Sequence, residues 1–379
     1  MHILIAPNAF KNSLDASAVA KYIGEGLQQS KLSCTVECFP VGDGGDGTAA
    51  LLIKNQKGTI HPVEVHDALE RMINSSFGLI DGGNTAVIEL ADASGIKFLA
   101  PHELDPLHTS TFGTGELMKY ALDKGISKII MCIGGSATVD GGTGILQALG
   151  IRFLNGDKLL ERLPESLVNL TTIDVSNFDK RILNCELVIL CDVKNKLLGE
   201  NGAAKIFGPQ KGASIGDVNI LETALTKFRE VALNQTGIDM STLEHGGAAG
   251  GVAAGLAIFC NAKLVDGIHH FLTLTSFDEA LQKADLVITG EGCIDSQTPE
   301  GKGPYGVALR AKEKNIPVIG IGGKVPLEEN KELQKYFDVL LSINNEPADT
   351  SEAIKNTKDN LLRTGKIIGD LLYVQNHLK

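Results

Sequence analysis

The stretch KIIMCIGGSATVDGGTGILQAL (128–149) carries the pattern that decides the fold. Its apolar start, KIIMCI, is followed at once by a glycine-rich segment and then by a helix-forming sequence. A buried strand that ends in a glycine-rich turn and leads into a helix is the basic unit of ligand-binding α/β proteins. The sequence therefore predicts an α/β protein whose chemistry lies on the loops that follow its strands.

Glycine-rich segments recur along the chain, which contains 43 glycines in 379 residues. They are not low-complexity filler, because several of them follow a short apolar run. The other clusters lie at 42–47, 113–115, 245–251, 290–292, 301–303 and 320–323. Since α/β proteins bind ligands at the carboxyl ends of their strands, these clusters are the first candidates for binding and catalysis.

The two ends of the chain together predict one parallel sheet. Short apolar runs that read as buried strands are joined by helical patterns, which is typical of a doubly wound sheet. The predicted strands are 2–7, 34–41, 284–290, 316–323 and 337–343. The predicted helices are 13–29, with Ser13 as its N-cap, 304–315 and 350–375.

The middle of the chain has a different pattern. Over 61–95, apolar and polar residues alternate in short runs, which favours antiparallel strands. Helices near 114–124, 141–149 and 216–235 and strands over 127–135 and 186–193 follow. We therefore predict an α/β fold of two unlike α/β domains. A Rossmann- or flavodoxin-like parallel-sheet domain is formed by 1–62 plus 283–379, and a mixed α/β domain, 63–282, is inserted in it.

The composition excludes several classes of protein. The net charge of −11 and the lack of a Lys/Arg-rich run argue against a nucleic-acid partner. The seven cysteines include no CxxC pair and are predicted to be buried free thiols in a reducing compartment. The N-terminus lacks a signal-peptide pattern, and no apolar stretch reaches the ~20 residues that cross a bilayer. We expect a cytoplasmic protein with no membrane partner, and a homo-oligomer is left open.

The loop GDGGDGT (42–48) satisfies the pattern G-x-G-x-x-G after a strand, which is the dinucleotide fingerprint. A nicotinamide-dependent dehydrogenase is therefore one interpretation. Asp43 and Asp46, however, place two carboxylates where a pyrophosphate would lie, and like charges repel. The same carboxylates suit a magnesium ion or the hydroxyl groups of a substrate.

The glycine-rich loop 134–144 is a candidate anion site. Backbone N–H groups freed by the glycines, together with the hydroxyls of Ser136 and Thr138, form a nest for an anion. Asp140 adds a carboxylate to the same loop. We assign these three residues to substrate binding.

Two further loops carry acids and lysines. Asp192 ends an apolar strand and is positioned to accept the proton of a hydroxyl group. The segment 284–304 combines acidic residues with a lysine, which phosphoryl-transfer sites favour. The candidates for nucleotide or phosphate binding are Gly290, Glu291, Lys302 and Lys211; Asp295 is a candidate for metal binding and catalysis, and Lys11, just past the first strand, for catalysis.

Familiar catalytic motifs are missing. The chain contains no Walker A sequence, no protein-kinase signature and no G-x-S-x-G elbow. A phosphoryl-transfer enzyme with this sequence must use another scaffold. A small-molecule sensor without catalytic activity is a further interpretation, although a sensor rarely needs so many acids and lysines at one sheet edge.

Seven segments in register resemble the bacterial glycerate kinase family, type I. They are APNAFKNSL (6–14), PVGDGGDGT (40–48), FGTGEL (112–117), IGGSATVDGGTG (133–144), CDV (191–193), FGPQKGA (207–213) and ADLVITGEG (284–292) with Ile294 and Asp295. The resemblance covers essentially the whole chain. It implies two unlike α/β domains with the active site in the cleft between them. It also implies ATP and Mg²⁺, with D-glycerate as acceptor and 2-phosphoglycerate as the expected product.

The roles that we assign rest on chemistry. Asp192 is predicted to be the base. Lys11 and Lys302 are predicted to offset charge on the transferring phosphoryl group, and Mg²⁺ is predicted to bind at Asp43, Asp46 and Asp295.

Overall fold

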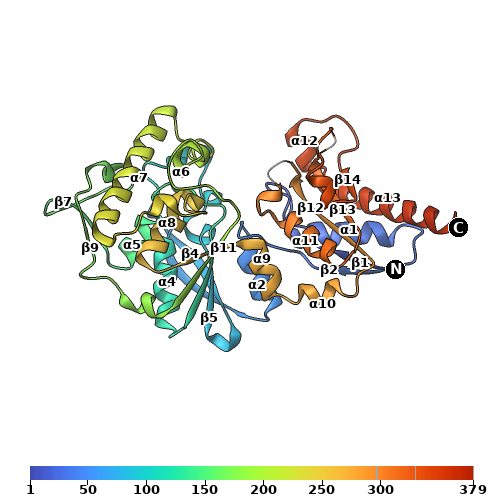
Figure 1. The fold of residues 1–379 in the computed structure, drawn as a ribbon, viewed down its shortest axis with the longest axis horizontal. Helices are drawn as coiled ribbons and strands as arrows, with labels where there is room; N and C mark the ends of the chain where they lie inside the picture. Colours follow the sequence, from blue (N-terminus) through green and yellow to red (C-terminus); the bar gives the residue numbers. More distant parts are fainter. Residues whose placement is uncertain (296–297, 329, 379) are drawn as a thin grey trace. The chain divides into compact units, whose positions relative to one another are not determined.

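The computed structural model describes residues 1–295, 298–328 and 330–378. The chain forms two compact units, one of Met1–Asp43 and Ile268–Lys379 and the other of Gly44–Gly267. Each unit contains its own sheets and core, and Figure 1 labels the elements. The division predicted from the sequence, 1–62 plus 283–379 with 63–282 inserted, stays a prediction. In the structure, residues 48–66 lie within the Gly44–Gly267 unit.

The first unit is built on a five-stranded parallel sheet of order β14-β13-β12-β1-β2. Its strands are β1 (His2–Ile5), β2 (Thr35–Cys38), β12 (Leu286–Cys293), β13 (Val318–Lys324) and β14 (Val339–Ser342). Its helices are α1 (Ala16–Gln28), α10 (Phe277–Leu281), α11 (Gly303–Glu313), α12 (Thr350–Lys355) and α13 (Thr357–His377), and α9 (Gly267–Leu274) begins at the boundary. The five predicted strands and the predicted parallel sheet are confirmed.

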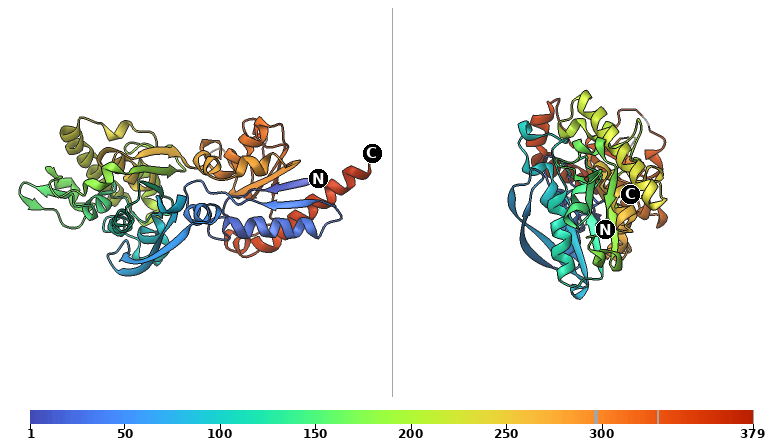
Figure 2. Two further views of the ribbon diagram at one scale, coloured as in Figure 1. Left: turned by 90° about the horizontal axis from the view of Figure 1, so that it is seen from below. Right: turned by 90° about the vertical axis from the view of Figure 1, so that its left-hand side faces the viewer.

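Helices α1 and α13 pack side by side on one face of this sheet, where the blue and red helices lie together in Figure 2. Glycine permits the close approach, because a Cβ at Gly26 would lie 2.2 Å from the carbonyl oxygen of Leu362 and one at Gly365 would lie 2.4 Å from that of Ile23. Isoleucines at alternate positions of the strands, such as Ile3 and Ile5, point into the core beneath these helices.

The second unit has a six-stranded mixed sheet of order β11-β10-β6-β5-β4-β3 and a small antiparallel sheet of order β8-β7-β9. Its strands are β3 (Thr59–His66), β4 (Met72–Ile80), β5 (Thr85–Glu89), β6 (Lys128–Cys132), β7 (Arg152–Asn155), β8 (Lys158–Leu159), β9 (Thr172–Asp174), β10 (Glu186–Cys191) and β11 (Lys263–Asp266). Its helices are α2 (Thr48–Asn55), α3 (Ala91–Ser94), α4 (Phe112–Asp123), α5 (Thr143–Ala148), α6 (Ala203–Phe207), α7 (Ile215–Thr236) and α8 (Val252–Phe259).

The antiparallel prediction for 61–95 is confirmed for β3, β4 and β5. β5 also pairs in parallel with β6, so the sheet changes from antiparallel to parallel pairing at β5. β5, β6, β10 and β11 run in parallel, and their carboxyl ends therefore lie at one edge of the sheet. The small sheet β8-β7-β9 was not predicted, because its strands are only two to four residues long.

Two details at helix ends differ from the prediction. Ser13 is not the N-cap of α1, because Asp15 caps the helix by accepting from the backbone N–H of Ala18. The hydroxyl of Ser13 instead donates to the carbonyl of Ile354. The predicted helix 350–375 is divided into α12 and α13 at Asn356.

The cysteines agree in part with the prediction of buried free thiols. All seven cysteines are free, but only Cys132, Cys185, Cys191 and Cys260 are buried. The prediction of burial was wrong for Cys38, which is exposed, and Cys34 and Cys293 are half-buried. Within the described part of the chain, none of the helices has the length and apolar character that crossing a bilayer requires.

Candidate active site

The carboxyl edge of the parallel sheet in the first unit gathers several of the predicted residues. The direction in which the chain adds strands reverses between β1 and β12. Doubly wound sheets bind ligands outside this point, at the carboxyl ends of the strands. Lys11 follows β1, Asp43 follows β2, and Glu291 lies near the end of β12.

The carboxylate of Asp43 is buried and held by two donors. The side-chain amide of Asn8 donates to Asp43 Oδ2 at 2.6 Å. The backbone N–H of Gly303, at the start of α11, donates to the same oxygen at 3.2 Å. Three segments that are far apart in the sequence are therefore joined at one carboxylate. Asn8 was not predicted as a site residue, because its partners come from other segments of the chain.

Glu291 is a buried acid beside two lysines. Thr298 Oγ1 donates to Glu291 Oε1 at 3.3 Å, and Lys302 Nζ lies 3.9 Å from the same oxygen. The pKa of Glu291 is raised to about 7: burial contributes most and the charge of Asp43 adds to it, whereas Lys302 and Lys11 lower it. A cation that binds beside this carboxylate stabilises its ionised form and lowers its pKa.

Lys302 joins Glu291 to Asp295. Its Nζ lies 3.5 Å from Asp295 Oδ1, and the Asp295 side chain is 40% exposed. The structure thus brings together the predicted residues Asp43, Glu291, Asp295 and Lys302, with Lys11 close enough to act on Glu291. Packing requires a glycine at position 290, because a Cβ there would lie 2.2 Å from the carbonyl oxygen of Ile321 on β13.

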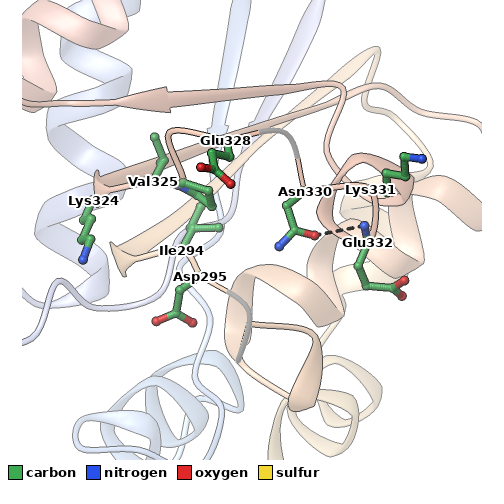
Figure 3. A pocket seen from close by; sticks show the side chains of 9 residues that line it. Ile294, Asp295, Lys324, Val325, Glu328, Asn330, Lys331 and Glu332 are labelled. Carbon is green, nitrogen blue, oxygen red and sulfur yellow. Dashed lines mark hydrogen bonds between the residues drawn. The ribbon is translucent and has the colours of Figure 1, made fainter.

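A cavity of about 530 Å³ borders Asp295 at the ends of β12 and β13. Ile294 and Val325 give it an apolar wall, and Lys324 and Glu328 give it charged groups (Figure 3). The cavity is open to solvent, has both apolar and charged walls, and lies beside the Lys302–Asp295 pair. This cavity was not predicted, because the residues around 324–332 contain no recognisable motif.

In the second unit, the loop after β6 is held by a buried lysine. Lys211 Nζ donates to Ser136 Oγ and to the carbonyl oxygen of Thr138, both at 2.7 Å. Burial lowers the pKa of Lys211 to about 7, and the charge of Asp140 opposes this shift. Lys211 was predicted to bind phosphate and Ser136 and Thr138 to bind the substrate, and these three residues are in contact in the structure.

Asp140 organises the same loop from within. Its carboxylate is fully buried and accepts hydrogen bonds from the backbone N–H groups of Thr111, Gly142 and Gly144 and from the hydroxyl of Thr111. Four donors of its own chain therefore surround this carboxylate. Its predicted role in binding the substrate stays a prediction.

Glu89 is an acid that the sequence analysis missed. It ends β5, is buried, and accepts from the backbone N–H groups of Gly47 and Ala49 at the start of α2, the latter at 2.9 Å. The pKa of Glu89 is raised to about 8: burial contributes most and the charges of Asp92 and Asp46 add to it, whereas the two backbone donors lower it. A single glutamate within the apolar run TAVIEL was the available signal.

Asp46 lies in a mixed cluster with Asp92 and Lys97. Lys97 Nζ is 2.8 Å from Asp92 Oδ1 and 3.4 Å from Asp46 Oδ1. Gly134, in the loop after β6, lets the two loops approach closely, because a Cβ at Gly134 would lie 2.4 Å from the Cα of Gly45. Asp46 is thus held in reach of the loop that follows β6.

Asp192, the predicted base, is half-buried directly after β10. Since β10 and β6 run in parallel, Asp192 and the loop 134–140 lie at the same edge of the sheet. The structure therefore places the predicted base and the predicted anion nest after neighbouring strands.

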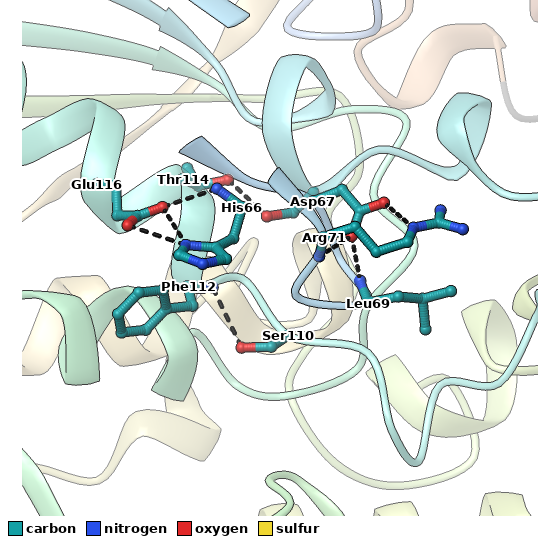
Figure 4. A network of polar contacts seen from close by, with 9 residues as sticks. His66, Asp67, Leu69, Arg71, Ser110, Phe112, Thr114 and Glu116 are labelled. Carbon is teal, nitrogen blue, oxygen red and sulfur yellow. Dashed lines mark hydrogen bonds and ion pairs between the residues drawn. The ribbon is translucent and has the colours of Figure 1, made fainter. Parts of the chain in front are cut away.

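A second polar network, at the hairpin of β3 and β4, has a structural explanation. Asp67 is buried and accepts from the backbone N–H groups of Leu69 and Arg71 and from the Arg71 side chain at 2.6 Å (Figure 4). Glu116 accepts from the backbone N–H of His66 at 2.8 Å and contacts its ring Nδ1 at 3.0 Å. These contacts close the turn and attach it to α4.

A metal ion was predicted at Asp43, Asp46 and Asp295, and this stays a prediction. In the ranges that the structure describes, no group of three or more His, Cys, Asp or Glu side chains is placed to hold a metal ion. The donors themselves suit magnesium, since Asp43 and Asp295 offer carboxylate oxygens and Glu291 is a buried acid beside them.

Known proteins resemble this chain over its full length. A model of the glycerate kinase family matches residues 3–373. The chain is 40% identical over 369 residues to a glycerate kinase of Bacillus subtilis (strain 168), with 97% of each chain covered. It is 39% identical over 376 residues to a glycerate 2-kinase of Escherichia coli (strain K12), with 99% of this chain and 98% of that one covered.

A solved structure is similar as well. It is a crystal structure from Salmonella typhimurium LT2 whose protein is described as a candidate glycerate kinase 2. The TM-score is 0.81 at 40% sequence identity, with 100% of this chain and 99% of the other covered. The similarity therefore spans both compact units and every loop described above.

Proposed function

This chain belongs to the glycerate kinase family, and from that relationship we propose that it transfers the γ-phosphoryl group of ATP to the 2-hydroxyl of D-glycerate. The observation that carries the proposal is the match of the family model to residues 3–373. The 2-phosphoglycerate product is supported by the relative from Escherichia coli, a glycerate 2-kinase. The dehydrogenase and sensor interpretations are not favoured, because the relatives named above are described as glycerate kinases.

The loop after β6 suits the acceptor. The hydroxyl of Ser136, in the loop 134–140, contacts the carboxylate of glycerate, and Asp192 after the neighbouring strand accepts the proton of the hydroxyl under attack. Ser136 retains 7% exposure, whereas Thr138 is fully buried. Ser136 is therefore the hydroxyl of this loop that meets the substrate.

The loops of the parallel sheet suit the donor. Lys302 and Lys11 offset the negative charge of the transferring phosphoryl group, and Asp43 and Asp295 are the proposed magnesium ligands on the same sheet edge. Magnesium supplies charge neutralisation at the phosphate oxygens when it is bound. Positioning and electrostatic stabilisation account for most of the rate in such reactions.

The test is the reaction of purified protein with ATP, Mg²⁺ and D-glycerate, followed by proton-coupled ³¹P NMR. Phosphate on the secondary 2-hydroxyl is coupled to one proton and gives a doublet, whereas phosphate on the primary 3-hydroxyl gives a triplet. We expect a doublet, and slower turnover with L-glycerate. In the same assay, Asp192→Asn is expected to reduce turnover by about 10²–10⁴-fold. A triplet would contradict the proposed position, and turnover of Asp192→Asn within a few-fold of wild type would remove Asp192 from its role.

A further inference from the structure

Lys211 is a charged side chain in an unusual position. It is 3% exposed, although an ammonium group loses much hydration energy when it is buried. It lies in the short 3₁₀ helix Pro209–Lys211, and Gly212, at φ 100°, passes so close to Leu104 that a Cβ would lie 2.2 Å from its carbonyl oxygen. The chain is thus built to hold this lysine inside the fold.

The contacts of Lys211 set the direction of the Ser136 hydroxyl. An ammonium group has donors only, so Ser136 Oγ must accept the hydrogen bond from Lys211. The hydrogen of the Ser136 hydroxyl is then left to point away from the lysine. Since Ser136 keeps a small exposed surface, its hydroxyl is available to donate to a ligand.

The rest of the loop is consistent with a bound anion. Within the described residues, Thr138 Oγ1 is buried and has no hydrogen-bond partner, although buried hydroxyls are normally paired. Asp140 is the charged group whose field acts on Lys211, and its own oxygens accept from three backbone N–H groups and the Thr111 hydroxyl. A negative ligand at Ser136 would add a second charge that favours the protonated lysine.

We propose that Lys211 serves the acceptor acid: it directs the Ser136 hydroxyl toward the carboxylate of glycerate and supplies the buried positive charge, so that glycerate binding is coupled to protonation of Lys211. This inference rests on the proposed function and deepens it. Lys211 acts through Ser136 and is a positioning residue. The assignment differs from the one made from the sequence, in which Lys211 contacts phosphate.

The pH dependence follows from linkage. Burial places the pKa of Lys211 near 7 in the free protein, and an adjacent carboxylate raises that pKa. Below pH 7 the lysine already carries its proton and glycerate binds without proton uptake. Above pH 7 each binding event must take up a proton, so the KM for glycerate rises up to tenfold per pH unit.

The experiment measures the KM for D-glycerate between about pH 6 and 9 at saturating ATP and Mg²⁺. For the wild type we expect a flat KM at low pH and a rise above pH 7. For Lys211→Met we expect a higher KM at every pH and no such rise. Lys205→Met, which removes a half-buried lysine of α6 that is paired with Glu200, is the matched control and should behave like the wild type.

Ser136→Ala keeps the lysine and removes the donor. We expect it to raise the KM for glycerate roughly 10–100-fold, as for a lost hydrogen bond to a charged group, while the KM for ATP and the rise above pH 7 remain. If Lys211→Met does not fold, Ser136→Ala still tests whether glycerate binding depends on the Ser136 hydroxyl. Titration calorimetry with D-glycerate alone, in buffers of different ionisation enthalpy, should show proton uptake at pH 8 in the wild type.

The outcomes are distinct. A KM for glycerate that does not change with pH in the wild type, or a KM for ATP that rises with Ser136→Ala while that for glycerate does not, would overturn the role of Lys211. If the wild type does not phosphorylate glycerate at all, the proposed function itself fails.

Discussion

Glu291 shows how one buried acid links stability to function. Its pKa is raised to about 7, chiefly by burial, whereas a glutamate in an unfolded chain titrates near 4.3. The ionised carboxylate therefore costs stability above pH 7, and this cost vanishes as pH falls through the folded and then the unfolded pKa. We expect Glu291→Gln to raise the free energy of unfolding by roughly 1–3 kcal/mol at pH 8 and to leave it nearly unchanged near pH 4.5.

Urea denaturation at the two pH values, without ATP or Mg²⁺, checks this expectation. Turnover should fall, because an amide cannot supply the negative charge beside Lys302. Asp295→Asn is the control, since its side chain is 40% exposed and its pairing with Lys302 contributes less than about 1 kcal/mol. An equal effect of Glu291→Gln at both pH values would show that Glu291 is not held as a buried carboxylate.

The pair of helices α1 and α13 depends on glycine at the crossing. A Cβ at Gly26 would lie 2.2 Å from the carbonyl oxygen of Leu362, a backbone atom that moves only if α13 moves. We expect Gly26→Ala to lower the free energy of unfolding by about 1–3 kcal/mol, measured by denaturation followed by circular dichroism. Gly24→Ala lies in the same helix and meets only side chains, at 3.3 Å or more, so it should be neutral or stabilising. Equal losses in both variants would contradict the close crossing.

The whole molecule consists of two compact units that differ in how the chain builds them. The unit Gly44–Gly267 is one continuous segment with its own six-stranded sheet and its own core of buried side chains. We expect residues 44–267, expressed alone, to unfold in one cooperative thermal transition. Residues 1–43 alone should not fold, because β1 pairs with β12, which lies much later in the chain. A fragment 44–267 without a cooperative transition would show that this unit depends on the rest of the chain.

Local sequence patterns determined the class of the fold and most of its elements. Strand, glycine-rich turn and helix follow from neighbouring residues, so the five parallel strands and α4, α5 and α7 were found within a few residues of their ends. The loops that carry the predicted acids and lysines were found for the same reason, since each follows an apolar strand. The prediction that Ser13 caps α1 was wrong, because Asp15 caps the helix and the Ser13 hydroxyl donates to the carbonyl of Ile354 instead.

Only the tertiary structure decided which of these residues meet. Lys211 lies 75 residues from Ser136 in the chain, and Gly303 lies 260 residues from Asp43, so no local pattern contains either contact. Burial is likewise set by the packed fold. It gives Glu89, Glu291 and Lys211 their shifted pKa values, because it removes water from groups whose sequence neighbours look ordinary. Periodicity is a short-range property of the chain, whereas desolvation and long-range pairing exist only once the sheets have assembled.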